Sequence, residues 1–217
     1  MSKLSTVILA FVSMIFCSWA EEPSPTQSPL DQKQGVLQEV WFNIAGNDVA
    51  DLTRHEEYQK SPQHAKIVSK IDFTNLFVPK IFGQRFTTLI VPEKTGDYRF
   101  HLASDDASEL WLSKNSSDKD MSCIAFVRGF TYHKGWFSQA SQISEPIHLE
   151  AGKAYLLIIL HKESGSPNHI ALAWTGPDIE KPTIIPENVF HLPEILEKNK
   201  EGILKALATP APASAEK

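Results

Sequence analysis

The segment from residue 96 to 113 most constrains the fold, because it combines two strand patterns with an acidic turn. Apolar residues alternate with polar or small ones over 98–102, which is the period of a half-buried β-strand, and Leu110 and Leu112 restart a second strand after a break. Between the two stretches the chain must reverse direction, and there it carries Asp105 and Asp106 side by side. The segment therefore predicts two successive strands separated by a turn that carries two carboxylates.

The two adjacent acids have two interpretations. Side-by-side carboxylates repel each other unless a positive group lies between them or water screens them. A hard cation that prefers oxygen ligands, Ca²⁺ above all, resolves that repulsion. The sequence thus makes Asp105 and Asp106 candidate metal ligands, while a solvated turn that happens to carry two acids stays open as the alternative.

The N-terminus indicates export. Lys3 is followed by an apolar run over 7–16, and small residues at Ser18 and Ala20 suit a signal peptidase, so residues 1–20 are predicted to be a signal peptide. Residues 21–34 are rich in Pro, Ser, Gln and charge, and we expect a disordered linker there. The expected location is secreted, periplasmic or at the cell surface, with cleavage near Ala20.

The net charge limits the kinds of partner that the chain can bind, and the cysteine content limits its disulfides. The leader carries one lysine and no acid, so its removal takes the formal net charge from −5 to −6. An acidic chain argues against nucleic acid as a partner, and no other apolar run is long enough for a transmembrane segment. Cys123 is the single cysteine left after cleavage, so no intramolecular disulfide is possible. The apolar residues that follow it predict that it is buried.

The segment 35–190 is predicted to be one domain, since it is long enough for its own core. Short apolar stretches separated by Gly, Pro and Asp are typical of an antiparallel β-sandwich or barrel. A short helix or irregular turn is expected over 49–58. Strands are expected over 40–42, 86–91, 98–102, 110–112, 124–127, 154–160 and 170–174.

The C-terminal segment changes character. Over 191–208 the leucines and isoleucines recur at helical spacing, which predicts an amphipathic helix. Gly202 costs such a helix on the order of 1 kcal/mol relative to Ala, so we expect it to lie on a surface. We expect that surface to be its own domain rather than a partner. Residues 209–217 are predicted to be a flexible tail.

Several blocks in order resemble the protective-antigen-type (PA-fourteen) domain family, from about residue 35 to 177. They are Gly96-x-Tyr98-x-Phe100, Ser104-Asp105-Asp106, Ser108–Leu112, Leu149–Tyr155, His161-Lys162-Glu163 and Ala171-x-Ala173-Trp174-x-Gly176-Pro177. The resemblance implies a β-sandwich of barrel-like shape and, in many members, carbohydrate binding. In some adhesin members two aspartates joined by a cis peptide hold a Ca²⁺ that contacts sugar hydroxyls. Asp105 and Asp106 match that pair.

Three further residues are candidates for contact with a glycan. Trp136 lies in a Gly-containing, partly polar stretch, and an aromatic ring there suits stacking on a sugar; a place in the core is its alternative. Asn168 and His169 lie in a loop where they suit hydrogen bonds to hydroxyls, with plain solvation as the alternative. Trp111 and Trp174 fall within strand patterns and are predicted to be core residues.

Catalysis finds little support in the sequence. The eight histidines are scattered, and there is no Gly-x-Ser-x-Gly elbow. Adjacent aspartates suit ligands better than the separated acid and nucleophile of a glycosidase. Together with the leader and with the family resemblance, which implies carbohydrate binding, this predicts a secreted, non-catalytic carbohydrate-binding domain that depends on Ca²⁺. The alternative is a structural or protein-binding assembly domain of the cell envelope, in which the Asp-Asp turn serves only the fold.

Overall fold

The computed structural model describes residues 33–75, 81–165 and 167–210. The predicted signal peptide and most of the predicted linker and tail lie outside these residues. Within them, no helix is long and apolar enough to cross a membrane.

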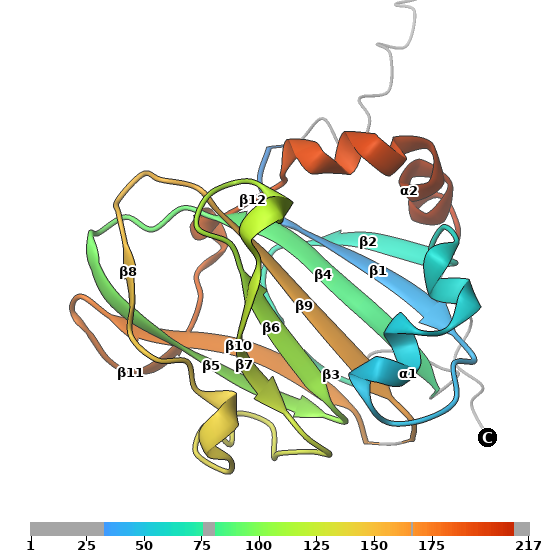
Figure 1. Ribbon diagram of the computed structural model, residues 1–217, viewed down its shortest axis with the longest axis horizontal. Helices are drawn as coiled ribbons and strands as arrows, with labels where there is room; N and C mark the ends of the chain where they lie inside the picture. The colour runs from blue at the N-terminus through green and yellow to red at the C-terminus, as the bar shows by residue number, and fades with distance from the viewer. Residues whose placement is uncertain (1–32, 76–80, 166, 211–217) are drawn as a thin grey trace, which may run out of the picture.

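The described chain forms two antiparallel sheets packed face to face (Figure 1). The first sheet has the order β2-β1-β4-β9-β6-β7, with β12 paired to β4; its strands are β1 (Val36–Phe42), β2 (His64–Val68), β4 (Phe82–Ile90), β6 (Ser108–Leu112), β7 (Ser122–Val127), β9 (Tyr155–Glu163) and β12 (Phe190–His191). The second has the order β11-β10-β5-β8, with β3 paired to β10; its strands are β3 (Asp72–Thr74), β5 (Gly96–Asp105), β8 (Ile147–Leu149), β10 (His169–Gly176) and β11 (Ile179–Ile184). This confirms the predicted antiparallel β-sandwich.

The main core lies between the two sheets and follows from the alternation in the sequence. Phe100 and Leu102 of β5 face inward together with Leu172 and Trp174 of β10, and all four are buried. Ile159 of β9 packs against them from the other sheet. Trp174 is therefore a core residue, as predicted. Trp111 instead lies half-buried on the outer face of the first sheet, beside Ile158 and Leu160.

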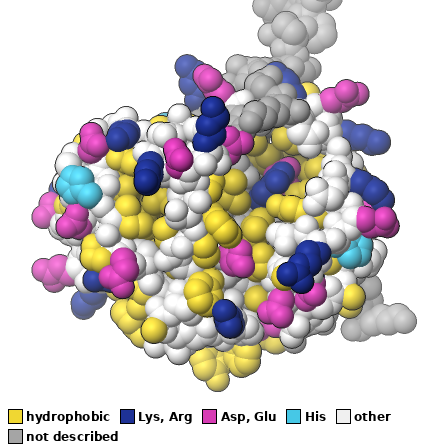
Figure 2. All heavy atoms as spheres, in the orientation of Figure 1, with side chains coloured by type: hydrophobic (Ala, Val, Ile, Leu, Met, Phe, Trp, Pro, Cys, Tyr) yellow, Lys and Arg dark blue, Asp and Glu magenta, His cyan; other side chains and the backbone are white. Residues whose placement is uncertain are grey.

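Two short α-helices lie on the outer face of the first sheet. The α-helices are α1 (Val49–Thr53) and α2 (Lys200–Leu207), and the 3-10 helices are η2 (Glu56–Gln59), η3 (Asp118–Asp120), η4 (Ala140–Gln142), η5 (Glu187–Val189) and η6 (Glu194–Asn199). Val49 of α1 packs on Leu160 of β9, which explains why that strand is apolar on both faces. Figure 2 shows acidic and basic side chains interspersed with hydrophobic ones on this face.

The C-terminal segment packs on its own domain, as predicted, but as three short elements. Residues 190–191 pair as β12, η6 follows, and α2 begins at Lys200. Ile203 and Ala206 of α2 form a small core with Leu37 of β1 and Ala65 of β2. Gly202 belongs to this contact, because a Cβ there would collide with Ser61.

The prediction that Cys123 is buried is wrong. Its thiol is exposed on β7, a strand at the edge of the first sheet. The alternation does place Ala125 and Val127 of this strand in the core. Cys123 lies nearer the end of the strand, opposite Trp111, where the pairing register shifts. The apolar residues that follow Cys123 therefore did not predict its exposure.

Candidate functional site

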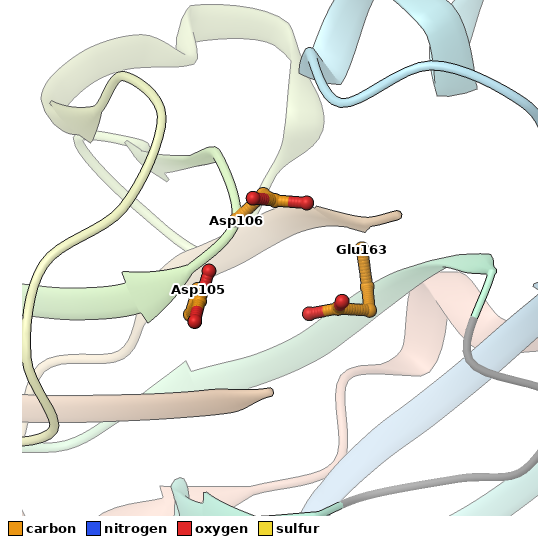
Figure 3. Close-up of side chains that lie close together, drawn as sticks. All are labelled: Asp105, Asp106 and Glu163. Atoms are coloured by element: carbon orange, nitrogen blue, oxygen red, sulfur yellow. The ribbon is translucent and has the colours of Figure 1, made fainter. Parts of the chain in front are cut away.

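Three carboxylates converge at one end of the sandwich (Figure 3). Asp105 is the last residue of β5, Asp106 follows it in the turn to β6, and Glu163 is the last residue of β9. One oxygen from each lies within 4.8 Å of the others. The peptide bond between Asp105 and Asp106 is cis, as the family resemblance implied.

The turn that follows β9 fixes two of these carboxylates. The backbone nitrogen and the hydroxyl of Ser164 both donate to Oδ2 of Asp106, at 2.9 and 2.6 Å. The backbone nitrogen of Gly165 donates to Oε1 of Glu163 at 2.6 Å. One oxygen of Asp106 and one of Glu163 are thus held by a single turn.

The second oxygen of Glu163 is the most informative atom of the site. Glu163 is only 1% exposed, and its Oε2 has no hydrogen-bond partner among the described residues. Burial, together with Asp106 and Asp105, raises the pKa of Glu163 to about 8. Burial and the neighbouring Asp106 raise the pKa of Asp105 to about 6. A buried carboxylate oxygen without a partner, close to two further acids, suits a bound cation, so this cluster could hold a metal ion.

A chain of buried polar side chains supports the turn from inside the sandwich. Nε2 of Gln38 donates to Oε1 of Gln84 at 2.8 Å, and Nε2 of Gln84 lies 2.7 Å from Nδ1 of His161. Burial lowers the pKa of His161 to about 4, so the ring is neutral near pH 7. Its Nδ1 then accepts from Gln84 and its Nε2 donates to the carbonyl of Asp105, 3.0 Å away. The chain of bonds ties the Asp-Asp turn to β1, β4 and β9.

Lys162 lies beside the acids on the outer side of β9. Its side chain is fully buried, and its Nζ donates to the carbonyl oxygen of Glu163 at 2.7 Å. Burial lowers the pKa of this lysine, whereas Asp106, Glu163 and Asp51 of α1 act to raise it. The ammonium therefore offsets part of the negative charge without bonding to the three carboxylates.

The structure brings two of the predicted glycan contacts close to Asp105. His169 of β10 is the direct register partner of Asp105, and Asn168 precedes it. Both are buried, at 7% and 3% exposed. Burial and the nearby His133 lower the pKa of His169 to about 4, and its Nε2 has no hydrogen-bond partner within the described ranges.

Trp136 lies in the loop of residues 128–139 and is half-buried there. This loop is fastened across the second sheet, because His133 and Lys134 each contact Asp72 of β3 at 2.9 Å. The site roles of Trp136, Asn168 and His169 remain predictions.

Sequence reasoning missed two features of the site. Glu163 was visible within the His161-Lys162-Glu163 block, but nothing in the sequence placed it beside the aspartates. The other feature is a pair of exposed aromatics in the loop 128–139, Phe130 at 58% and Tyr132 at 77% exposed. Phe130 forms a β-bridge with Asp105, so this aromatic pair borders the carboxylate cluster. The strand-like spacing of 130 and 132 was the available signal.

The fold and the carboxylate turn together define the class of this protein. The model of the PA14 domain family matches residues 32–188, so the chain belongs to that family.

One relative is the mouse N-acetyl-beta-glucosaminyl-glycoprotein 4-beta-N-acetylgalactosaminyltransferase 1. It is 30% identical over 175 residues, which cover 75% of this chain and 17% of the relative. This chain therefore spans less than a fifth of that protein.

Solved structures share the fold at low sequence identity. The PA14 domain of the antifreeze protein MpAFP has a TM-score of 0.58 and 11% identity, over 78% of this chain and 96% of that one. The epithelial adhesin 9 A domain of Candida glabrata, solved in complex with Galβ1-4GlcNAc, has a TM-score of 0.55 and 13% identity, over 76% and 93% of the two chains.

Proposed function

We propose that this chain is a secreted, non-catalytic carbohydrate-binding domain in which Asp105, Asp106 and Glu163 hold Ca²⁺. The observation that carries the proposal is the buried Oε2 of Glu163, which has no hydrogen-bond partner in the described part of the chain. Burying an unpaired carboxylate beside two others is costly, and a cation removes that cost.

Calcium fits this donor set better than other common metals. Three carboxylates are hard oxygen donors, and Ca²⁺ takes six to eight oxygen ligands in flexible geometry. The three side chains do not fill such a shell. When bound, the ion would offer its remaining positions to oxygen ligands such as neighbouring sugar hydroxyls. The domain's own contribution is to hold the carboxylates together through the turn at Ser164 and the chain of bonds through His161.

The exposed aromatics supply the second element of a sugar site. Pyranose rings have apolar C–H faces that stack on aromatic rings. Phe130 and Tyr132 are exposed beside Asp105 and suit that role. Trp136, Asn168 and His169 are proposed to complete the contacts. The complex of the Candida adhesin with Galβ1-4GlcNAc supports a sugar as the kind of ligand.

The spacing of the carboxylates supports a non-catalytic role. Glycoside hydrolysis needs two carboxylates about 5–10 Å apart, on either side of the scissile bond. Here the three acids approach within 4.8 Å of one another and share a single space. That arrangement suits metal ligands. Export follows from the predicted leader at residues 1–20, and the acidic net charge of the chain disfavours nucleic acid as a partner.

A glycan array tests the proposal. We expect binding in CaCl₂ that is lost in EDTA. Asp106→Asn should lose most of the signal while keeping the fold, because it removes one charge at nearly constant shape. Asp120→Asn, at an exposed residue of η3, is the matched control and should bind normally. Binding to no glycan would favour the assembly-domain alternative. Normal binding by Asp106→Asn would place the ligand elsewhere, with Trp136 the next residue to test.

A further inference from the structure

We propose that the cleft between α1 and the β6–β7 pair binds the second sugar ring of the ligand, so that this domain recognises an oligosaccharide rather than a terminal monosaccharide alone. This inference rests on the proposed function, since it takes the first ring to lie at Asp105, Asp106 and Glu163. It adds a second subsite, with its own residues, on the outer face of the first sheet.

The cleft has the size of a binding site. Its volume is about 400 Å³. It is lined by Asp48 and Val49 at the start of α1, Ala107 just before β6, Glu109 of β6, Phe126 of β7 and Arg128 just after β7. Small-molecule sites have volumes of roughly 300–1,000 Å³. The cleft therefore has room for a sugar ring.

The cleft adjoins the carboxylate site through a single residue. Ala107 follows Asp106 directly, lines the cleft, and is only 3% exposed because it packs against Val49 and Leu160. Its carbonyl accepts from the backbone nitrogen of Lys162 at 2.9 Å, which fixes this residue on β9. On the opposite wall, Arg128 is two residues from Phe130, which bridges to Asp105. A glycan that leaves the cation site along this side therefore enters the cleft.

The lining chemistry suits a neutral sugar. The guanidinium of Arg128 lies 5.2 Å from the centre of the Phe126 ring and, within the described residues, forms no ion pair. Oε2 of Glu109 accepts from Nε1 of Trp111 at 3.0 Å, and that bond uses one of its two oxygens. A guanidinium donor, a carboxylate acceptor and an aromatic face are the groups that hydroxyls and a C–H face require. Because the two acids Asp48 and Glu109 outnumber the one arginine, an acidic ring is disfavoured and a neutral ring suits the cleft.

The picture of the surface agrees with this description. The elements that line the cleft, α1, β6 and β7, lie on the face that Figure 2 shows. Acidic and basic side chains lie close together on that part of the surface, with hydrophobic side chains between them.

The test is an array that carries each terminal sugar alone and extended to a di- and a trisaccharide, probed in CaCl₂. For the sugars that bind, we expect the disaccharide to bind at least tenfold more tightly than its terminal monosaccharide. Arg128→Ala should remove most of that gain and leave monosaccharide binding unchanged. Arg128 is exposed, so the variant should fold. Arg54→Ala, at the exposed C-cap of α1 and outside the cleft, is the matched control and should behave as wild type.

Glu109→Gln gives an independent readout of the same subsite. The amide oxygen preserves an acceptor for Trp111 while the charge is lost, so the disaccharide gain should fall without loss of stability. Equal affinity for monosaccharides and oligosaccharides would overturn the second subsite and leave the proposed function standing. So would an oligosaccharide gain that survives in both Arg128→Ala and Glu109→Gln. Binding to no sugar at all would overturn both proposals.

Discussion

The inward-facing side chains of β9 are apolar at one end of the strand and polar at the other. At one end, Tyr155, Leu157 and Ile159 face inward and belong to the apolar core. At the other end, the same inward row continues with His161 and Glu163, which are equally buried. The strand and its alternation are unchanged along this row, yet the interior turns from apolar to polar as it approaches the Asp-Asp turn.

The difference shows which kind of stability each end has. The apolar end depends on burial and close packing, which are not directional. The polar end depends on specific partners, namely the bonds of Gln84 to His161, of His161 to Asp105, and of Ser104 to Ser108 at 2.6 Å. Oε2 of Glu163 has no hydrogen-bond partner among the described residues, so the polar end is the one that a bound cation would complete.

The largest effect is expected at the apolar end. Trp174 is 3% exposed and packs on Tyr98 at 4.7 Å and Phe100 at 6.3 Å between ring centroids. Trp174→Ala should lower the free energy of unfolding by about 3–5 kcal/mol, because it leaves a large cavity. Denaturant unfolding measures this, with Trp174→Phe as a milder control. A loss below about 1 kcal/mol would mean that this end of the core tolerates cavities.

The next effect is expected at the polar end, from metal alone. Ca²⁺ at a hundredfold excess over its dissociation constant should stabilise the fold by about 2.7 kcal/mol. The melting temperature should therefore rise in Ca²⁺ and much less in Mg²⁺, which demands a tighter octahedral shell. Glu163→Gln and Asp106→Asn should each reduce the rise. Identical melting curves in Ca²⁺ and EDTA would show that no Ca²⁺ binds at the polar end.

The apolar end could be predicted from the sequence, and the polar end only in part. Alternation located β5 and β10, because their inward residues are apolar and their outward ones are polar or small. The spacing of Leu110 and Leu112 located β6, and an apolar run on both faces located β9. These patterns missed β2, β3, β8, β11 and the two-residue β12. β3 and β8 are only three residues long, and β11 contains Pro182 and no buried residue. A pattern that depends on burial cannot report strands of that kind.

The carboxylate site could also be predicted only in part from the sequence. Asp105 and Asp106 are neighbours in sequence, so the sequence itself brings them together. Glu163 reaches them through the pairing of β9 with β6, in which Ser108 lies opposite His161. That register depends on the tertiary structure, so it cannot be predicted from the spacing of residues in the sequence. Cys123 gives the converse case, because an edge strand with a register shift exposed a residue that its apolar neighbours suggested was buried.

A smaller effect is expected on the pH dependence of stability, where Glu163 and the buried histidines act in different pH ranges. The pKa of Glu163 is raised from 4.5 to about 8, so the folded state binds its proton more tightly than the unfolded state does. Its contribution to stability therefore falls as the pH rises from about 4.5 to about 8. The pKa values of His161 and His169 are lowered from 6.5 to about 4, so their opposing effect is confined below pH 6.5.

Between pH 6.5 and 8, metal-free wild type should thus lose on the order of 1 kcal/mol relative to Glu163→Gln, which cannot titrate. Urea unfolding in EDTA at several pH values measures the difference between the two proteins. A constant difference across this range would show that Glu163 is already ionised at pH 6.5. Ca²⁺ should abolish the loss, since a bound cation favours the ionised carboxylate.

The smallest effect is expected at Cys123, which belongs to neither end of the sandwich interior. Its side chain is exposed, and its contact from Sγ to the carbonyl of Ala125 is long at 3.6 Å. Cys123→Ala should change the free energy of unfolding by less than about 0.5 kcal/mol, as surface substitutions usually do. A thiol reagent should label the native protein readily. Because burial and Glu109 raise the pKa of this thiol, labelling should be slower than for a free thiol at the same pH and should accelerate as the pH rises. Labelling that needs denaturant would instead place Cys123 inside the core, and the edge of β7 would then have to be packed differently.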